Sequence, residues 1–562
     1  MQIGKPIVLI IILGVISMIF PQEAEVISDY AAIGHVKEQI QKFAPVEISY
    51  DQNLLSEKEQ KALIAIVKAA KYMDQIFLQQ VYEKNEQIKS ALQKKNSSEY
   101  RYLLDYFTLS FGPFDRLDQD KPFINLAEQK PAGANFYPPD LSKEEYERWI
   151  ENNPGDKSDF MSNFTIIRRQ GDKLIAVPYS EVYKKELTAA SNLLKEAADL
   201  VENPSLNTFL NSRAEAFLSN DYFQSDMDWM DLKDHPIEVV IGPYEVYEDE
   251  LFGYKASFEA FVTLVDPVES EKLRQVNQYL EEMENNLPLP TEYKNTRRGS
   301  ASPIVVVQEV FTAGDTKAGV QTTAFNLPND ERVREAKGSK KVMLKNVAQA
   351  KFEKCWIPIV NEVIDASNLP FIKFDAYFNH VLMHEMSHGM GPGIVIRDGQ
   401  ETSVGLELKE TYPTIEEAKA DLLGLLNTQF LIDKKFLPDS LEKQTYVTYL
   451  GGIFRSVRFG ITSAHGGANI IEYNFLKERG GFIYDETTQK FRIDMNQLKI
   501  AVKELAAKLL LLQAELNYSG AVEFIEKYRH TPDEIRLALE RLSDVPVDIR
   551  PVFSIEKQVS MD

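Results

Sequence analysis

The chain has 562 residues, of which 44% are hydrophobic and 26% are charged, a composition typical of a folded globular protein with more than one lobe. Its formal net charge of -22 opposes binding to nucleic acid. The single cysteine, Cys355, excludes an intramolecular disulfide. Oligomeric state is left open by the sequence.

The N-terminal segment has the pattern of a targeting signal. Lys5 precedes an uncharged apolar run over residues 7–20, which is short for a transmembrane helix and typical of the core of an export signal. We interpret residues 1–24 as a signal peptide or an N-terminal anchor. We therefore expect export, to a bacterial periplasm or cell envelope, with membrane contact only through an uncleaved anchor. A buried first segment of a cytoplasmic protein is the alternative.

The remaining chain alternates between helical and extended patterns. Apolar residues at spacings of three and four predict helices over residues 56–112 and 180–218, the first opened by a capping box of Ser56 and Glu59. Residues 234–267 and 302–330 are rich in Val, Ile and Phe and predict strands.

The second half of the chain is predominantly helical. A helix is expected between the two strand regions, and after Lys345 the pattern is mainly helical until about Tyr528, followed by an extended tail. We predict an α+β fold that is mostly α-helical, with two lobes separated by a substrate cleft. The mixed lobe, with a β-barrel-like sheet, would comprise residues 25–265, 309–356 and 545–562. The helical lobe would comprise residues 266–308 and 357–544.

The sequence His384-Glu385-Met386-Ser387-His388 is an H-E-x-x-H motif. Side chains four residues apart share one face of a helix, so both imidazoles can bind one metal ion, and neutral imidazole suits zinc. Glu385 can reach a metal-bound water and act as a general base. Three glycines and a proline in residues 389–393 then predict the end of the helix. The alternative is a histidine-rich helix end without metal.

A carboxylate cluster follows in residues 416–421. Glu416, Glu417 and Asp421 can supply a third ligand and accept the ring N–H groups of the ligating histidines. The alternative for Glu417 is a capping box with Thr414. His380, one turn before His384, is either a fourth ligand or a histidine of the surrounding core.

Several separated stretches resemble the dipeptidyl peptidase III family of metallopeptidases. Residues 416–421, EEAKAD, resemble the family's E-E-C-R-A-E/D signature, whose second glutamate binds zinc. Residues 238–262 resemble its E-S-Y-I-G-F and F-E-G-F segments, and residues 326–347 its N-I-P-N-Y-D and K-N-V segments. Residues 463–476 resemble its A-H-M-Q-A-R stretch. The resemblance covers most of residues 200–530. It implies that Glu417 is the third zinc ligand and that Glu416 and Asp421 hold the ligating histidines.

The resemblance also implies substrate-binding residues. Glu238, Asn326 and Asn329 would hold the free α-amino group of a peptide, and His465 would stabilise the oxyanion of the tetrahedral intermediate. From the residues alone, the asparagines beside Pro328 also suit ordinary turn chemistry. His465, which precedes two glycines, also suits a helix cap.

The chain departs from the family pattern at several places, and Ala418 and Lys419 stand where the family signature has cysteine and arginine. Most members carry H-E-x-x-x-H, whereas this chain has the shorter, regular motif. The family's tyrosine after the substrate-binding glutamate aligns with Val240, so its role is vacant or passes to Tyr244 or Tyr247.

Together, these features predict a zinc-dependent exopeptidase with one zinc ion per chain. It would release dipeptides from the free N-terminus of oligopeptides, with Glu385 as general base and the peptide paired to a strand near residues 239–241. One alternative is a zinc aminopeptidase or oligopeptidase of other specificity. The other is a non-catalytic, metal-containing peptide-binding protein.

Overall fold

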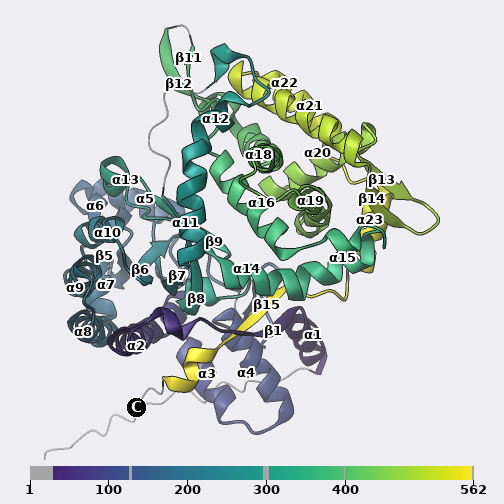
Figure 1. Ribbon diagram of the computed structural model, residues 1–562. Coiled ribbons are helices and arrows are strands. Elements are labelled where there is room, and N and C mark those ends of the chain that lie inside the picture. Colours follow the sequence, from purple (N-terminus) through teal and green to yellow (C-terminus); the bar gives the residue numbers. More distant parts are fainter. Residues whose placement is uncertain (1–29, 126–128, 295–302, 398, 560–562) are drawn as a thin grey trace, which may run out of the picture.

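The computed structural model describes residues 30–125, 129–294, 303–397 and 399–559 (Figure 1). The expected leader, residues 1–24, lies outside this part of the chain. Within the described residues, no helix is both long enough and apolar enough to cross a membrane. Most of the described chain is helical, and its buried apolar residues form two large clusters, one around a β-sheet and one among helices.

A five-stranded sheet forms the centre of the mixed lobe. Its strand order is β6-β7-β8-β10-β9, with all neighbours antiparallel except β8 and β10. The strands are β6 (Ile237–Glu245), β7 (Ser257–Val265), β8 (Ile304–Gly314), β10 (Lys340–Leu344) and β9 (Ala324–Leu327). Within the part of the chain that the structure describes, β6 and β9 have no second neighbouring strand, so the sheet is open and the expectation of a barrel-like sheet is wrong in this respect.

Long helices cover this sheet. The helix α2 packs across β7 and β8, and α8 packs against α2 and α9 (Figure 1). The predicted capping box at the start of α2 is present, since Ser56 and Glu59 exchange hydrogen bonds. The helices of this lobe are α1 (Tyr30–Gln41), α2 (Glu57–Val81), α3 (Asn85–Gln93), α4 (Ser98–Ser110), α5 (Lys143–Asn152), α6 (Lys157–Met161), α7 (Tyr179–Val182), α8 (Lys184–Leu200), α9 (Pro204–Ser219) and α10 (Phe223–Met230).

Short strands join distant parts of the sequence. The predicted extended tail is β15 (Asp548–Phe553), and it pairs in parallel with β1 (Phe43–Ile48), a strand that the sequence analysis did not predict. Segments near the two ends of the described chain therefore pair in one small sheet. Among the described residues, four hairpins complete this group: β2 (Phe114–Asp115) with β3 (Lys121–Pro122), β4 (Thr165–Gln170) with β5 (Lys173–Pro178), β11 (Ile394–Arg397) with β12 (Gln400–Ser403), and β13 (Phe482–Asp485) with β14 (Lys490–Ile493).

The two large hydrophobic clusters meet along one continuous helical segment. It consists of α14 (Lys345–Lys351), a π-helical turn over Phe352–Trp356, and α15 (Ile357–Val363). Cys355 is buried in the cluster around the sheet, and Trp356 is buried in the helical cluster. This segment therefore contributes buried side chains to both cores.

The helical lobe is arranged around α18, which packs against α16, α19, α20 and α21 (Figure 1). Helical structure continues beyond Tyr528 to Arg541. The remaining elements are α11 (Pro267–Val276), α12 (Leu280–Asn285), α13 (Glu331–Lys337), α16 (Phe374–Ser387), β11 (Ile394–Arg397), β12 (Gln400–Ser403), α17 (Val404–Leu408), α18 (Tyr412–Asp433), α19 (Leu441–Val457), α20 (Ala464–Glu478), α21 (Met495–Ala514), α22 (Tyr518–Tyr528) and α23 (Asp533–Arg541).

Candidate metal centre

The candidate metal centre lies where α16 and α18 pack together. A glycine on α18 allows this close approach: a Cβ atom at Gly424 would lie 3.1 Å from the backbone nitrogen of His384 and 3.2 Å from the ring of His380. The helix α16 ends at Ser387, with His388 as its C-cap, so the predicted helix end is confirmed. This geometry places the last turn of α16 against the middle of α18.

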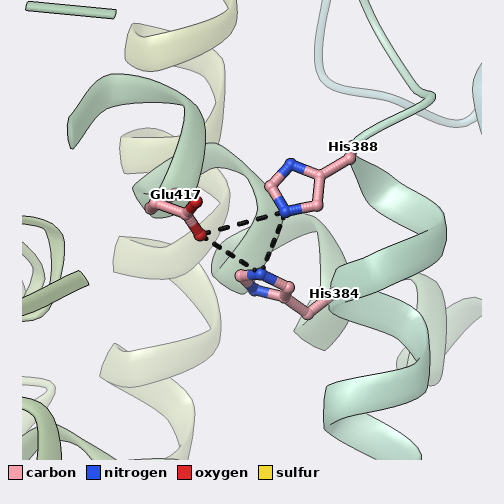
Figure 2. Close-up of side chains that lie close together, drawn as sticks. All are labelled: His384, His388 and Glu417. Carbon is pink, nitrogen blue, oxygen red and sulfur yellow. Dashed lines mark hydrogen bonds and ion pairs between the residues drawn. The ribbon is translucent and has the colours of Figure 1, made fainter. Parts of the chain in front are cut away.

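Three side chains converge at this point (Figure 2). The Nε2 atoms of His384 and His388 are 3.1 Å apart. One carboxylate oxygen of Glu417, Oε2, is 3.3 Å from His384 Nε2 and 3.9 Å from His388 Nε2. The structure thus brings together the three residues that the sequence analysis named as zinc ligands.

Two further carboxylates fix the orientation of the imidazoles. Asp421 Oδ1 lies 2.7 Å from His384 Nδ1, and Glu416 Oε1 lies 2.9 Å from His388 Nδ1. Each carboxylate accepts a hydrogen bond from the Nδ1–H group, so that in the neutral imidazole, the form that binds a metal, the lone pair lies on the Nε2 atom. These two lone pairs face one another and the Glu417 carboxylate.

Such a set of acceptor atoms fits a cation. Among the described residues, Glu417 Oε2 is buried without a hydrogen bond of acceptable geometry, although His384 and His465 are close to it. Acceptors that face one another repel unless a positive charge lies between them. Two imidazole nitrogens and one carboxylate oxygen are the donor set of an open, catalytic zinc site.

The sequence alternative for Glu417, a capping box with Thr414, is wrong. The helix α18 begins at Tyr412 with Thr411 as its N-cap, so Thr414 and Glu417 both lie inside the helix. Glu417 is therefore free to face α16.

The carboxylate of Glu416 is held in its charged form. Burial alone would raise the pKa of Glu416, but Lys419 and His388 outweigh this effect and lower the pKa to about 2. Lys419 Nζ lies 2.7 Å from Glu416 Oε1 and donates to the carbonyl of Met390. Gln513 donates to the second oxygen of Glu416. A charged Glu416 accepts the hydrogen bond that fixes His388.

Glu385 lies beside His384 and faces the sheet. Its carboxylate forms an ion pair with Lys341, which belongs to β10 of the mixed lobe. Burial alone would raise the pKa of Glu385, but the positive charge of Lys341 outweighs it and lowers the pKa. Glu385 is therefore unprotonated and able to accept a proton. Sequence reasoning missed Lys341, because the pair joins residues that are 44 positions apart.

Two other histidines border the centre. His380 Nε2 lies 2.9 Å from the carbonyl oxygen of Asp421, so His380 supports α18 rather than acting as a fourth ligand. His465 Nδ1 lies 3.1 Å from Glu417 Oε2, and its side chain is 66% exposed. Ser463 is the N-cap of α20, which argues against a capping role for His465.

An asparagine that sequence reasoning missed completes the network. Asn469, one turn after His465, donates hydrogen bonds to Asp421 Oδ2 and to Glu472. Its place in the stretch AHGGAN, four residues after the histidine, is the signal that could have found it.

A cavity of about 450 Å³ adjoins these residues. Its wall includes His384, Glu385 and His465 at the metal centre, and Thr323 directly before β9. The candidate metal-binding residues therefore open onto a space between the helical lobe and the edge of the sheet.

The predicted anchor residue Glu238 does not face this space. Its side chain is 1% exposed, and both carboxylate oxygens lie 3.2 Å from Lys340 Nζ. His235 Nε2 lies 2.9 Å from the same carboxylate. Burial alone would raise the pKa of Glu238, but Lys340 and His235 lower it. Glu238 forms a buried ion pair, which argues against contact with a substrate.

Tyr244 is also buried. Its ring packs against the guanidinium of Arg213, 5.5 Å away, in the interior of the lobe. Burial raises the pKa of the Tyr244 phenol. By contrast, Tyr247 is 79% exposed. Of the two tyrosines considered from the sequence, only Tyr247 is accessible to a ligand.

The two predicted asparagines lie at the edge of the sheet. Asn326 is an exposed residue of the edge strand β9, opposite Lys341 in the register. Asn329 is exposed and donates a hydrogen bond to the carbonyl of Tyr244, and its side chain also bonds to Glu245. Glu245 is the acidic residue that the structure places beside them, and the sequence analysis missed it. The pattern Glu245-x-Tyr247 matches the E-S-Y motif and was the available signal.

Comparison with known proteins identifies the family of this chain. The sequence model of peptidase family M49 matches residues 152–449. A solved structure of DPP III from Caldithrix abyssi is 55% identical, with a TM-score of 0.90, and the match covers 93% of this chain and 100% of that one. Dipeptidyl-peptidase III from Corallococcus sp. strain EGB is 40% identical, with a TM-score of 0.76, over 94% of this chain and 98% of that one.

A plant protein from Arabidopsis thaliana, named Nudix hydrolase 3, is also similar. It is 38% identical over 574 residues, which cover 92% of this chain and 74% of that protein. The human protein named dipeptidyl peptidase 3 is 23% identical over 357 residues, 54% of this chain and 48% of that protein. The chain belongs to peptidase family M49, the dipeptidyl peptidase III family, and is a hydrolase of the metallopeptidase class.

Proposed function

We propose that the chain is a zinc-dependent exopeptidase that releases dipeptides from the free N-terminus of oligopeptides. The observation that carries this proposal is the donor set of His384, His388 and Glu417, whose acceptor atoms face one point beside the carboxylate of Glu385. These three residues would hold one zinc ion. When bound, zinc lowers the pKa of a coordinated water and polarises a carbonyl group.

The residues around this point supply the proton transfers. Glu385, kept unprotonated by Lys341, accepts a proton from the attacking water and returns it to the leaving amine. His465 lines the same cavity and is positioned to donate a hydrogen bond to the developing oxyanion. Asp421 and Glu416 keep the two ligating imidazoles in one orientation throughout.

The edge strand β9 is the expected pairing partner of the peptide. The strand β6, which contains residues 239–241, is buried at eight of its nine positions, so the pairing expected there is replaced by pairing to β9. β9 is half-exposed, and its neighbour β10 carries Lys341, which contacts Glu385. Main-chain hydrogen bonds to an edge strand bind peptides with little dependence on sequence.

The ammonium group of the peptide would bind at the end of β9. Glu245 is half-buried beside Asn329, and Tyr247 is exposed next to them. A carboxylate and an amide oxygen are suitable acceptors for an ammonium group. We therefore assign the anchor to Glu245, Asn326 and Asn329 rather than to Glu238, and the role expected of Tyr244 to Tyr247.

Metal analysis with paired substrates tests the function. We expect one zinc ion per chain, loss of hydrolysis on metal removal, and preference for a dipeptidyl arylamide over a single-residue arylamide. Preference for the single-residue substrate would instead indicate an aminopeptidase. A metal-loaded protein that binds peptides without cleaving either substrate would indicate a binding protein.

Export remains part of the proposal and is tested separately. The apolar run in residues 7–20 supports a leader. Cell fractionation with mass determination of the mature N-terminus would show export with a cleaved leader, an uncleaved anchor, or a cytoplasmic protein.

A further inference from the structure

A guanidinium group lies in the wall of the cavity that adjoins the metal centre. Arg455, in the last turn of α19, lines this cavity with the aromatic residues Trp356, Tyr377 and Phe459. His384 and Glu385 lie in the wall of the same cavity. Arg455 therefore shares one continuous space with the residues that would perform hydrolysis.

Arg455 has no anionic partner within the described part of the chain. Its guanidinium contacts the ring of Phe459, 5.6 Å away, and forms neither a hydrogen bond nor an ion pair there. Two neighbouring cations are different: Lys351 pairs with Asp548 at 2.9 Å, and Arg458 donates to backbone carbonyls. A half-buried guanidinium with aromatic neighbours and a free hydrogen-bonding face is well suited to bind a carboxylate.

A peptide bound along β9 would extend toward Arg455 with its C-terminal part. With its N-terminus at Asn329, a peptide paired to β9 must run antiparallel to the strand, toward Thr323. Thr323 lines the cavity that contains Arg455. The residues that follow the cleaved bond therefore enter this cavity.

We propose that Arg455 binds a carboxylate on the part of the peptide that follows the cleaved bond. This carboxylate is either the C-terminus of a short peptide or an acidic side chain, so Arg455 favours peptides that place one of these groups beside it. This inference rests on the proposed function and adds a determinant of specificity to it. A hydrogen-bonded ion pair of this kind changes kcat/KM by roughly ten- to a hundredfold.

Matched acid and amide substrates test this assignment. Tri-, tetra- and penta-alanine are compared as free acids and as C-terminal amides, which varies the α-carboxylate alone. Amidated peptides with Glu or Gln at the third position vary the side-chain carboxylate alone. The proteins are the wild type, Arg455→Met, Arg455→Lys and Arg492→Met, the last removing an exposed arginine of β14 outside the cavity.

The expected result is an acid-to-amide ratio of kcat/KM of about ten or more in the wild type at one peptide length. Arg455→Met reduces this ratio to about one, Arg455→Lys keeps part of it, and Arg492→Met leaves it unchanged. Discrimination only between Glu and Gln peptides would identify the side chain as the source of the carboxylate. The proposal is overturned if the wild type shows a ratio near one both for acid against amide peptides and for Glu against Gln peptides. It is also overturned if a larger ratio remains unchanged in Arg455→Met.

A second measurement covers the case of an inactive variant. Isothermal titration of metal-free wild type and Arg455→Met with the same acid and amide peptides compares binding without hydrolysis. Equal affinity loss for acid and amide in the variant would contradict carboxylate recognition. Failure of the proposed function is distinguishable, because the wild type would then release no dipeptide from a dipeptidyl arylamide, which carries no carboxylate.

Discussion

The metal centre between α16 and α18 differs in physical character from the edge of the sheet at Asn326 and Asn329. At the centre, Asp421 holds His384 and Glu416 holds His388, and the two helices pack closely at Gly424. At the edge, both asparagines are exposed and Tyr247 is 79% exposed. The closely packed region suits a reaction that needs fixed geometry, and the exposed edge suits recognition of a variable peptide.

This contrast predicts different consequences of mutation in the two regions. Changes at the metal centre should affect the chemical step or metal affinity. Changes at the edge should affect peptide binding and the choice of the cleaved end. Changes at the buried pair of Glu238 and Lys340, which lies in neither region, should affect stability.

The largest effect is expected for Glu385→Gln. Loss of the general base should lower kcat by a factor on the order of 10²–10⁴, while zinc content stays at one ion per chain. Measurement of kcat together with bound metal checks this prediction. Glu486→Gln, in an exposed turn, is the matched control and should keep full activity. Full activity of the Glu385 variant would refute the mechanism.

Next in size is the effect of Glu238→Gln on stability. The substitution leaves Lys340 buried without its counter-charge and should cost about 3–5 kcal/mol of unfolding free energy at pH 7. Urea denaturation measures this loss. Glu202→Gln, which breaks an exposed pair with Lys58, should cause no measurable change. If Glu238→Gln raised KM without loss of stability, the original assignment of Glu238 to the substrate would be right.

The ion pair of Glu238 also predicts that the stability of the protein depends on pH. Because the pKa of Glu238 is lowered in the folded state, its contribution to stability is present above the pKa of an unfolded glutamate, about 4.3, and is lost as the pH falls through the folded value. The stability difference between wild type and Glu238→Gln should therefore shrink below about pH 4. A constant difference from pH 7 down to pH 3 would contradict the ion pair.

Asp421→Asn tests the support of the ligating histidines. Loss of the carboxylate that holds His384 Nδ1 should weaken zinc binding by roughly ten- to a hundredfold. Competition with a chelator measures this affinity, with Asp439→Asn on an exposed turn as the control. Unchanged affinity would show that the packing of α16 against α18 suffices.

A smaller effect is expected at the edge of the sheet. Glu245→Gln should raise KM for free peptides by about tenfold with little change in kcat, since the carboxylate binds the ammonium group rather than the reacting atoms. Steady-state kinetics with a dipeptidyl arylamide separates the two constants. A large fall in kcat with unchanged KM would move Glu245 from binding to catalysis.

The two regions also differ in how well the sequence predicts them. His384 and His388 were found because helix geometry alone puts residues four apart on one face. Glu417 required the resemblance to a family, since nothing local shows that α18 packs on α16. Glu238 was assigned to the substrate because the resemblance aligned the family's E-S-Y motif with Glu238 rather than with Glu245 and Tyr247. Its ion-pair partner Lys340 is 102 residues away, so the sequence did not show the buried pair.

Contacts between distant parts of the sequence explain the other features that were not predicted. The strand β1 was not predicted because it is completed only by β15 at the far end of the chain. The expectation of a barrel-like sheet was wrong because alternation in a sequence predicts strands but does not show whether the edge strands pair with each other. The role of Lys341 could not be predicted because its ion pair with Glu385 forms only when β10 and α16 pack together.

The central claim is that hydrolysis at α16 and α18 is directed to the second peptide bond by an ammonium anchor at the edge of the sheet. Mass spectrometry of the products from one hexapeptide, with its amine free or acetylated, tests this claim most directly. The account predicts successive release of dipeptides from the free peptide and no cleavage of the acetylated one. Equal cleavage of both peptides, or release of single residues, would contradict it.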